Sequence, residues 1–274
     1  MSRYRTKWNQ EVYNKMLKEG YGQGTGVDYK PWISIYDFSS QGRVARIKGK
    51  KIDRIFHLLS SIESSMFYIL QWDDSVKDIR EQYPLLSVNE TIDISENLGI
   101  KHPVDNKTGV AYVVTTDFLV TRLIEGKEIM LAYAIKPIGE LSKQRVIDKL
   151  KIEETFWAKR SIKWQLVTDM DINRTMVSNI KWFFEAYDIE RLINPKNVNQ
   201  MTEILYSFIQ ENTDKSAIRS VIELDEVYDV EQGNFLTLLK HLLAHKFLIY
   251  DLSKPFSNSI KLSEIQINKE KFKC

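Results

Sequence analysis

Two charged residues interrupt apolar, strand-like runs in the first half of the chain. Asp117 stands in TTDFLV (115–120), and Lys136 stands in LAYAIKP (131–137), just before a proline. A charged side chain is rarely buried in a strand unless it is paired or binds a ligand. An acid that holds a metal ion, beside a lysine that stabilises negative charge, can cleave a phosphodiester bond. Taken singly, each residue is explained equally well as a satisfied polar group at a strand end.

The position two residues before this lysine holds Ala134, whereas phosphodiester-cleaving sites commonly have an acid or an amide there. A third candidate, Glu63, lies at the start of the helical segment SIESSMFYILQW (61–72). Ser60-x-x-Glu63 also has the spacing of a capping box, in which the glutamate only accepts a hydrogen bond from a backbone amide at the helix start. Glu63 therefore has a catalytic and a structural interpretation, and the spacing alone does not choose between them.

The elements around these residues follow a mixed α/β pattern. Residues 61–72 carry apolar side chains at i, i+4, i+7 and i+8, which predicts a helix that starts at Ser60 or Ser61. Three strands rich in β-branched and aromatic residues are predicted next, at 76–86, 111–120 and 128–137. The sequence RLIEGK between the last two strands predicts a hairpin turn. This turn would allow Asp117 and Lys136 to lie side by side on adjacent strands.

A second helix and a last strand complete this half of the chain. Ser142 is the predicted cap of the helix. The inner side of the helix is predicted to carry Val146, Ile147, Leu150, Glu154 and Trp157. WQLVTD (164–169) then indicates a short buried strand. An α-β-β-β-α-β order with an acid on the first helix, an acid on the second strand and a lysine on the third is a nuclease arrangement.

The chain begins with a helical stretch (9–20), a glycine-rich loop (20–32) and a basic hairpin (42–54). The loop has G-x-G-x-G spacing after a helix, so we interpret it as a DNA-facing or packing loop and not as a dinucleotide site. The predicted DNA-binding residues are Arg43, Arg46, Lys48, Lys50, Lys51 and Arg54, with Lys101 and His102 in GIKHP. An edge hairpin that its lysines protect from pairing is the alternative.

The composition changes at TDMDIN (168–173), where the strand patterns stop. We therefore predict two domains, 1–169 and 170–274. The second domain contains a strongly amphipathic helix around residues 201–209. Two more helices and a closing hairpin follow it, and this order is typical of a winged helix.

The third of these helices carries basic residues where a winged helix reads DNA. His241 and His245 lie at i, i+4, but no third metal ligand accompanies them, which favours an exposed helix face over a metal site. Acidic residues at 225–231 precede the basic ones. The second domain is therefore expected to contact a protein partner as well as DNA.

The composition excludes several classes of protein. The net charge of the 274 residues is +2, so a polyanion must be recognised by local clusters of basic residues. The one cysteine, Cys274, can form neither an intrachain disulfide nor a multi-cysteine zinc site. Because no apolar run is long enough to span a bilayer and the first residues have no apolar signal region, we expect a cytoplasmic protein without a membrane partner.

An ordered set of segments from about residue 20 to residue 183 resembles one family. In order, the segments are GYGQGTGVDYKPW, FHLLSSIE, VKDIREQYPLL, GIKHP, TTDFLV, AIKP, KLKIEETFW, TDMDIN and NIKW. The set resembles the TnsA family, the restriction-endonuclease-like subunits of bacterial TnsA/TnsB heteromeric transposases. The resemblance implies a restriction-endonuclease-like αβββαβ core in the first domain and a smaller, mainly α, winged-helix-like second domain.

The resemblance also implies roles for individual residues. It makes Glu63, Asp117 and Lys136 the catalytic residues. It implies a Mg²⁺ site, in which Mn²⁺ can substitute, formed by Glu63, Asp117 and the backbone carbonyl of Ile135. Ala134 departs from the family pattern, which has an amide or an acid at that position. The loss of a metal ligand there would impair cleavage.

The implied function is hydrolysis of the 5′ strands at transposon ends, while a TnsB-like partner transfers the 3′ ends. The implied partners are transposon-end DNA, the TnsB-like transposase and a TnsC-like AAA+ ATPase, in the bacterial cytoplasm. Two other functions stay open. One is a non-catalytic assembly subunit, which Ala134 favours, and the other is a stand-alone repair or restriction nuclease.

Overall fold

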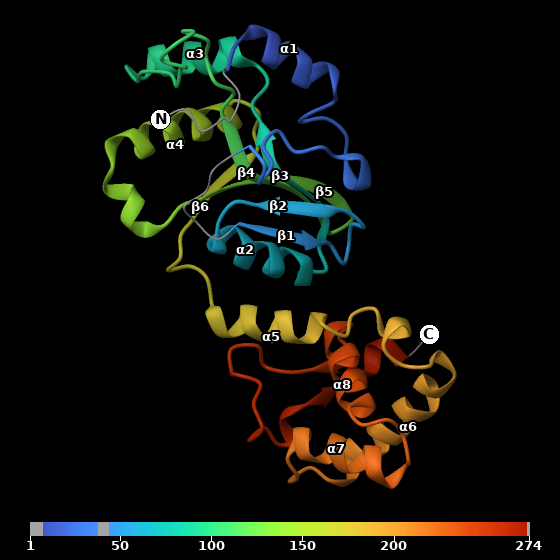
Figure 1. Ribbon diagram of the computed structural model, residues 1–274. Helices are drawn as coiled ribbons and strands as arrows, with labels where there is room; N and C mark the ends of the chain where they lie inside the picture. The colour runs from blue at the N-terminus through green and yellow to red at the C-terminus, as the bar shows by residue number, and fades with distance from the viewer. Residues whose placement is uncertain (1–7, 38–43, 273–274) are drawn as a thin grey trace. The chain divides into compact units, whose positions relative to one another are not determined.

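The computed structural model describes residues 8–37 and 44–272. The chain divides into two compact units, Met1–Ile172 and Asn173–Cys274 (Figure 1). Arg43, one of the predicted DNA-binding residues, lies outside the described residues.

The boundary between the two units falls after Ile172, three residues beyond the predicted boundary at 169/170. A hydrogen-bonded turn at residues 168–171 explains this position. The N–H and the hydroxyl of Thr168 donate to the Asp171 carboxylate at 2.8 and 2.7 Å. Ile172 still packs against the core of the first unit, and the Asn173 side chain caps the next helix. The sequence TDMDIN therefore belongs mostly to the end of the first unit.

A four-stranded mixed sheet forms the centre of the first unit. Its strands are β3 (Val76–Pro84), β4 (Thr115–Ile124), β5 (Lys127–Ile135) and β6 (Lys163–Val167). They lie in that order, with β4 antiparallel to both neighbours and β6 parallel to β5. Glu125 and Gly126 join β4 to β5 with φ of 51° and 76°, the geometry of the tight hairpin that EGK predicted. Strand β6, which was predicted to be a short buried strand, is instead a partly exposed edge strand.

Helices cover both faces of this sheet (Figure 1). On one face, α2 (Ser61–Trp72) packs Met66, Phe67 and Leu70 against Phe118 and Val120 of β4. On the other face, α3 (Val88–Asn97) and α4 (Gln144–Ala158) form a second core with the alternate residues of the strands. The sheet therefore buries both faces, which explains the apolar runs within its two central strands, β4 and β5.

Two details of this layer differ from the sequence predictions. Residues 88–97 form α3 between the first two core strands, in a segment where no helix was predicted. The prediction that Ser142 caps α4 is wrong, because Lys143 is the cap residue and makes no side-chain cap bond. The Ser142 hydroxyl donates instead to the Gly139 carbonyl, at 2.9 Å, within the short helix η2 (Ile138–Ser142).

The glycine-rich loop is a packing loop. It follows α1 (Gln10–Lys18) and contains η1 (Gly26–Asp28). Gly22 has φ of 72°, and a Cβ there would meet the Pro84 ring at 2.2 Å. The loop thus lies directly on the end of β3. The basic hairpin β1 (Ala45–Lys48) and β2 (Ile55–Leu58) follows it, as predicted.

The second unit has the order of a winged helix. Its main helices are α5 (Arg174–Phe184), α6 (Pro195–Glu211), α7 (Ala217–Val227) and α8 (Asn234–Ala244). Strands β7 (Leu248–Ile249) and β8 (Gln266–Ile267) pair as a small hairpin, and Ser216 bridges to Lys261 beside it. The side chains of α8 form the core of this unit, because Leu238, Leu239, Leu242 and Leu243 are all buried.

Candidate active site

Asp117 and Lys136 meet where β4 and β5 separate. The backbone ladder ends at the pair Phe118 and Tyr133, and the Asp117 carboxylate takes the place of the next backbone acceptor. Its Oδ2 accepts the N–H of Ile135 at 2.6 Å and the ammonium of Lys136 at 2.7 Å. The same ammonium donates to the Ile135 carbonyl at 2.8 Å. The lysine charge therefore lies against two of the three oxygen donors that the resemblance assigns to a metal ion, the Asp117 carboxylate and the Ile135 carbonyl.

Glu63 makes the capping contacts that its spacing predicts, and its carboxyl also lies near Asp117. The Ser60 hydroxyl accepts the Glu63 N–H at 3.1 Å, and Glu63 Oε2 accepts the N–H of Leu59 at 2.9 Å, so the residue takes part in capping α2. The carboxylate also accepts a hydrogen bond from the Gln82 amide at 3.3 Å and is only 6% exposed. Burial, and then the nearby charge of Asp117, raise its pKa to about 7. A cation near this carboxylate would therefore be favoured.

The lysine remains charged in this setting. Burial alone would lower the pKa of Lys136, but the adjacent Asp117 carboxylate raises it above its ordinary value. Its backbone is held by β6, since the Lys136 N–H donates to the Val167 carbonyl at 3.1 Å. The site thus contains a fixed positive charge next to two acids.

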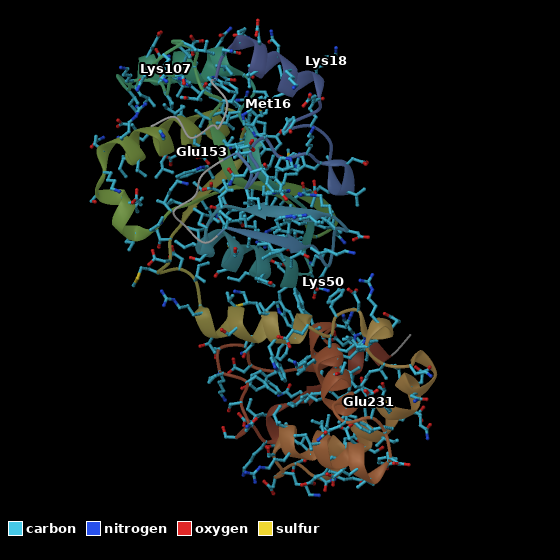
Figure 2. All side chains as sticks on the ribbon, in the orientation of Figure 1. Met16, Lys18, Lys50, Lys107, Glu153 and Glu231 are labelled. Carbon is cyan, nitrogen blue, oxygen red and sulfur yellow. The ribbon has the colours of Figure 1, made fainter. Side chains whose placement is uncertain are left out.

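A third acid, which no sequence pattern indicated, lies nearby. Glu153 on α4 points inward between the helix and the sheet, whereas the predicted inner residue, Glu154, is exposed (Figure 2). Glu153 accepts hydrogen bonds from Thr116 at 2.8 Å and from the Trp164 indole at 3.0 Å. Burial, and then the charge of Asp117, raise its pKa to about 7. The prediction that Glu154 lies on the inner side of α4 is wrong, because the preceding residue, Glu153, lies there.

Ala134 supplies no oxygen to the site. It is completely buried, and it pairs with Leu166 across β5 and β6. Its neighbour Ile135 offers only the backbone carbonyl already held by Lys136. The carboxylates of Glu63 and Asp117 with this carbonyl are the hard oxygen donors that Mg²⁺ prefers, so the residues present fit a divalent cation. Among the described residues, no cluster of three or more His, Cys, Asp or Glu side chains could hold a metal.

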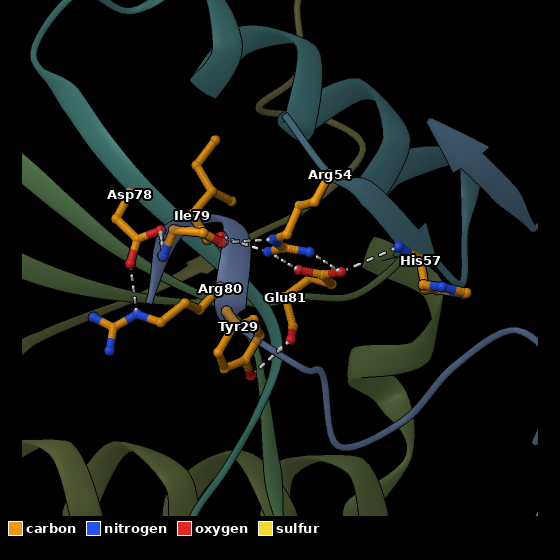
Figure 3. A network of polar contacts seen from close by, with 8 residues as sticks. Tyr29, Arg54, His57, Asp78, Ile79, Arg80 and Glu81 are labelled. Atoms are coloured by element: carbon orange, nitrogen blue, oxygen red, sulfur yellow. Dashed lines mark hydrogen bonds and ion pairs between the residues drawn. The ribbon is translucent and has the colours of Figure 1, made fainter. Parts of the chain in front are cut away.

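The Arg54 side chain is bonded within the fold, so the prediction that it contacts DNA is corrected (Figure 3). Its guanidinium forms two bonds to the Glu81 carboxylate, at 2.8 and 2.6 Å, and a third to the Ile79 carbonyl at 2.8 Å. Its Nε donates to the Gly26 carbonyl at 3.1 Å, and the Tyr29 hydroxyl donates to the Glu81 carbonyl at 3.1 Å. This network joins the glycine-rich loop and the basic hairpin to β3.

The other predicted DNA-binding residues divide by exposure. Arg46, Lys48 and Lys101 are exposed. Lys51 is half-buried, and its ammonium donates to the backbone carbonyl of Asp73. Arg46, Lys48 and Lys101 therefore present cationic surface, although Lys48 pairs with Asp53 at 2.9 Å, while Lys51 also stabilises the hairpin.

Two more of these residues bond within the first unit. The Lys50 N–H donates to the Gln71 amide oxygen at 2.7 Å, so its backbone stabilises the hairpin, and its side chain extends from the loop between β1 and β2 (Figure 2). His102 is buried between the Thr91 hydroxyl and the Pro103 carbonyl, each 3.0 Å away. The prediction that His102 contacts DNA is therefore corrected.

The histidine pair of the second unit is neither a metal site nor an exposed face. His241 Nδ1 lies 3.1 Å from the carbonyls of Ala186 and Tyr187, and His245 Nε2 lies 2.9 Å from the Tyr187 carbonyl. Lys240 pairs with Glu185 at 2.6 Å. This side of α8 is therefore occupied by the end of α5 and the residues after it, and the prediction of an exposed face was wrong.

Comparisons with known proteins cover both units. The family model described as TnsA-like endonuclease N terminal matches residues 73–169, and the model described as TnsA endonuclease C terminal matches residues 171–252. The chain is 35% identical over 256 residues to the Escherichia coli transposon Tn7 transposition protein TnsA, with 93% of this chain and 91% of that protein covered. No helix within the described residues is long and apolar enough to cross a membrane. Both matches and the restriction-endonuclease-like fold lead to one assignment: the chain belongs to the TnsA endonuclease family.

Proposed function

We propose that the chain is the DNA endonuclease subunit of a heteromeric transposase and hydrolyses the 5′ strands at transposon ends during cut-and-paste transposition. The observation that carries the proposal is the cluster of Glu63, Asp117 and Lys136 at the end of the central sheet. Family membership supplies the substrate class, because the similar Escherichia coli protein is named as a Tn7 transposition protein.

The residues of the cluster have separate roles in this proposal. Glu63, Asp117 and the Ile135 carbonyl would hold Mg²⁺, for which Mn²⁺ can substitute. When bound there, the metal would supply a water molecule of lowered pKa and positive charge beside the phosphate. The Lys136 ammonium, 2.7 Å from Asp117 Oδ2, would orient the attacking water or stabilise the charge of the transition state. The products are a 5′-phosphate and a 3′-hydroxyl.

Exposed surfaces of both units suit the proposed partners. Arg46, Lys48 and Lys101 can neutralise phosphates of transposon-end DNA. In the second unit, the end of α7 exposes acidic residues together with Val227 and Tyr228, which are 73% and 47% exposed. A mixed apolar and acidic surface suits a protein, and we assign it to a TnsB-like transposase or a TnsC-like AAA+ ATPase. The proposed location is the bacterial cytoplasm, where these partners and the DNA meet.

Ala134 favours a second candidate, a non-catalytic assembly subunit that binds DNA and the two proteins. Loss of a partner of a metal ligand commonly reduces affinity or activity about 10 to 100-fold, and loss of a ligand itself should cost at least as much. The two candidates differ in one measurable property, which is strand cleavage by this chain.

Strand-specific nicking of transposon-end DNA tests the proposal. The chain is assayed with Mg²⁺ or Mn²⁺ and the partner transposase, beside Asp117→Ala, Ala134→Gln and the control Glu128→Ala, an exposed acid on β5. Nicking at the 5′ ends by the wild type and the control, lost in Asp117→Ala, supports the endonuclease. Nicking only by Ala134→Gln would identify an assembly subunit. Cleavage of plain duplex without the transposase would identify a stand-alone nuclease.

A further inference from the structure

Gln82 lies beside the central acid of the site. The register of β3 on β4 pairs the residues on either side of Gln82 with those on either side of Asp117, so the two lie across from each other. On the opposite side, the pair Phe118 and Tyr133 places Ala134 across from Asp117 one step further along. Asp117 is therefore flanked by a glutamine on β3 and by the alanine on β5 that lacks an oxygen.

The backbone of Gln82 turns its side chain toward the site. Its φ is 48°, a left-handed conformation that is unusual for a residue other than glycine. Ile79 packs in the core on the α2 face, but Tyr83, four residues later, packs against the core on the other face, so the alternation reverses between them. Gln82 can thus reach Glu63, with its Nε2 3.3 Å from Oε2, although strict alternation would direct it to the opposite face.

Contacts on both sides hold this strained residue in place. The Trp32 N–H donates to the Gln82 carbonyl at 3.2 Å, and Trp32 itself is completely buried. The preceding residue, Glu81, is fixed by the two bonds from Arg54 described above (Figure 3). Strain of this kind persists only where surrounding contacts determine it, and it is concentrated at functional sites. The side chain is 2% exposed, so a polar group is being kept inside the protein next to the acids.

We propose that Gln82 supplies to the active site, from the β3 side of Asp117, the side-chain amide that β5 lacks at Ala134. The inference rests on the proposed endonuclease function. The Gln82 Nε2 orients the Glu63 carboxylate by its hydrogen bond. The amide oxygen, on the same carbon, adds a hard donor to those of Glu63, Asp117 and Ile135. The alanine of this chain is thereby compensated by a residue from a different strand.

Mn²⁺ binding to the full chain, measured by calorimetry without DNA, is the primary test. Gln82→Gly removes the amide and keeps the left-handed backbone free of strain. It is expected to weaken Mn²⁺ binding about 10 to 100-fold. Adding Ala134→Gln to Gln82→Gly is expected to raise the Mn²⁺ affinity again by at least about tenfold. Ala134→Gln alone is expected to change the Mn²⁺ affinity by less than about threefold, because the Gln82 amide already serves the site.

Two further proteins separate metal binding from folding. Gln71→Ala removes another buried glutamine, on α2, whose amide oxygen bonds to the backbone of the basic hairpin. It is expected to lower the unfolding temperature without changing Mn²⁺ affinity. If Gln82→Gly does not fold, Gln82→Asn keeps an amide but retracts it by one methylene, and an intermediate loss of affinity is expected.

The outcomes distinguish this inference from the function on which it rests. Wild-type Mn²⁺ affinity in Gln82→Gly, with binding abolished by Asp117→Ala, would overturn the role of Gln82 and leave the endonuclease intact. An equal effect of Ala134→Gln with and without Gln82 would also overturn it, because the two amides would then not substitute for each other. Absence of any Mn²⁺ binding in the wild type would overturn both proposals.

Discussion

Replacing Glu153 by glutamine should stabilise the protein at neutral and alkaline pH. The carboxyl is 5% exposed, and its pKa rises from an ordinary 4.5 to about 7 in the folded chain. The folded state therefore holds a proton that the unfolded state releases between these two values, and stability falls as the pH rises through that interval. At about 1.4 kcal/mol per pKa unit, the charged carboxylate costs about 3 kcal/mol above pH 7.

Glutamine removes this pH-dependent penalty and keeps an oxygen for Thr116 and Trp164. The difference in free energy of unfolding between Glu153→Gln and the wild type should be near zero at pH 4.5 and rise to about 3 kcal/mol at pH 8. Glu63 is present in both proteins, so its titration cancels in the difference. Glu154→Gln, on the exposed side of the same helix, should show no such trend.

Urea unfolding at intervals of pH, followed by tryptophan fluorescence, measures this difference. Trp157 and Trp164 both lie in the first unit close to the substitution and report on its unfolding. A constant difference across the pH range, or a variant less stable than the wild type at pH 8, would refute the reasoning that the Glu153 charge is penalised by burial. The same variant in the nicking assay would show whether cleavage requires the Glu153 carboxylate, whose charge destabilises the fold.

Two further perturbations have expected outcomes. Gly22→Ala should destabilise the first unit by about 2–4 kcal/mol in urea unfolding, because the left-handed backbone and the contact with Pro84 of β3 both oppose a Cβ. Gly20→Ala, which has the same backbone conformation but no close neighbour, should cost only about 1 kcal/mol. Arg54→Met should lose about 3–5 kcal/mol by leaving the Glu81 charge buried alone. Arg46→Met, at an exposed position, should change stability by less than about 0.5 kcal/mol but reduce the salt dependence of DNA binding by about one unit of slope, as measured by fluorescence anisotropy.

Several elements of the site were predictable because their signals are local. Asp117 and Lys136 interrupt apolar runs, and the two-residue turn between β4 and β5 fixes the register that brings them together. Ser60 and Glu63 carry the capping signal that starts α2. In each case the interactions that decide the structure join residues a few positions apart, or strands joined by one tight turn.

Other features depended on distant contacts and had no local signal. Helix α3 has a mostly polar sequence and is held by the burial of Ile94 and the bond of Thr91 to His102. Glu153 and Glu154 differ by about 100° around α4, and only packing against the sheet selects the inner one. Arg54 belongs to a basic run in the sequence, but its partner Glu81 lies 27 residues away on another strand.

The sequence by itself determined the strands, the two acids, the lysine and the missing oxygen at Ala134. Local periodicity and turn chemistry are sufficient for these, because they depend on short stretches of chain. Only the tertiary structure decided that Gln82 faces the acids. Its left-handed backbone is accompanied by a hydrogen bond from Trp32 and by the buried pair of Arg54 and Glu81, contacts that no periodicity within β3 encodes.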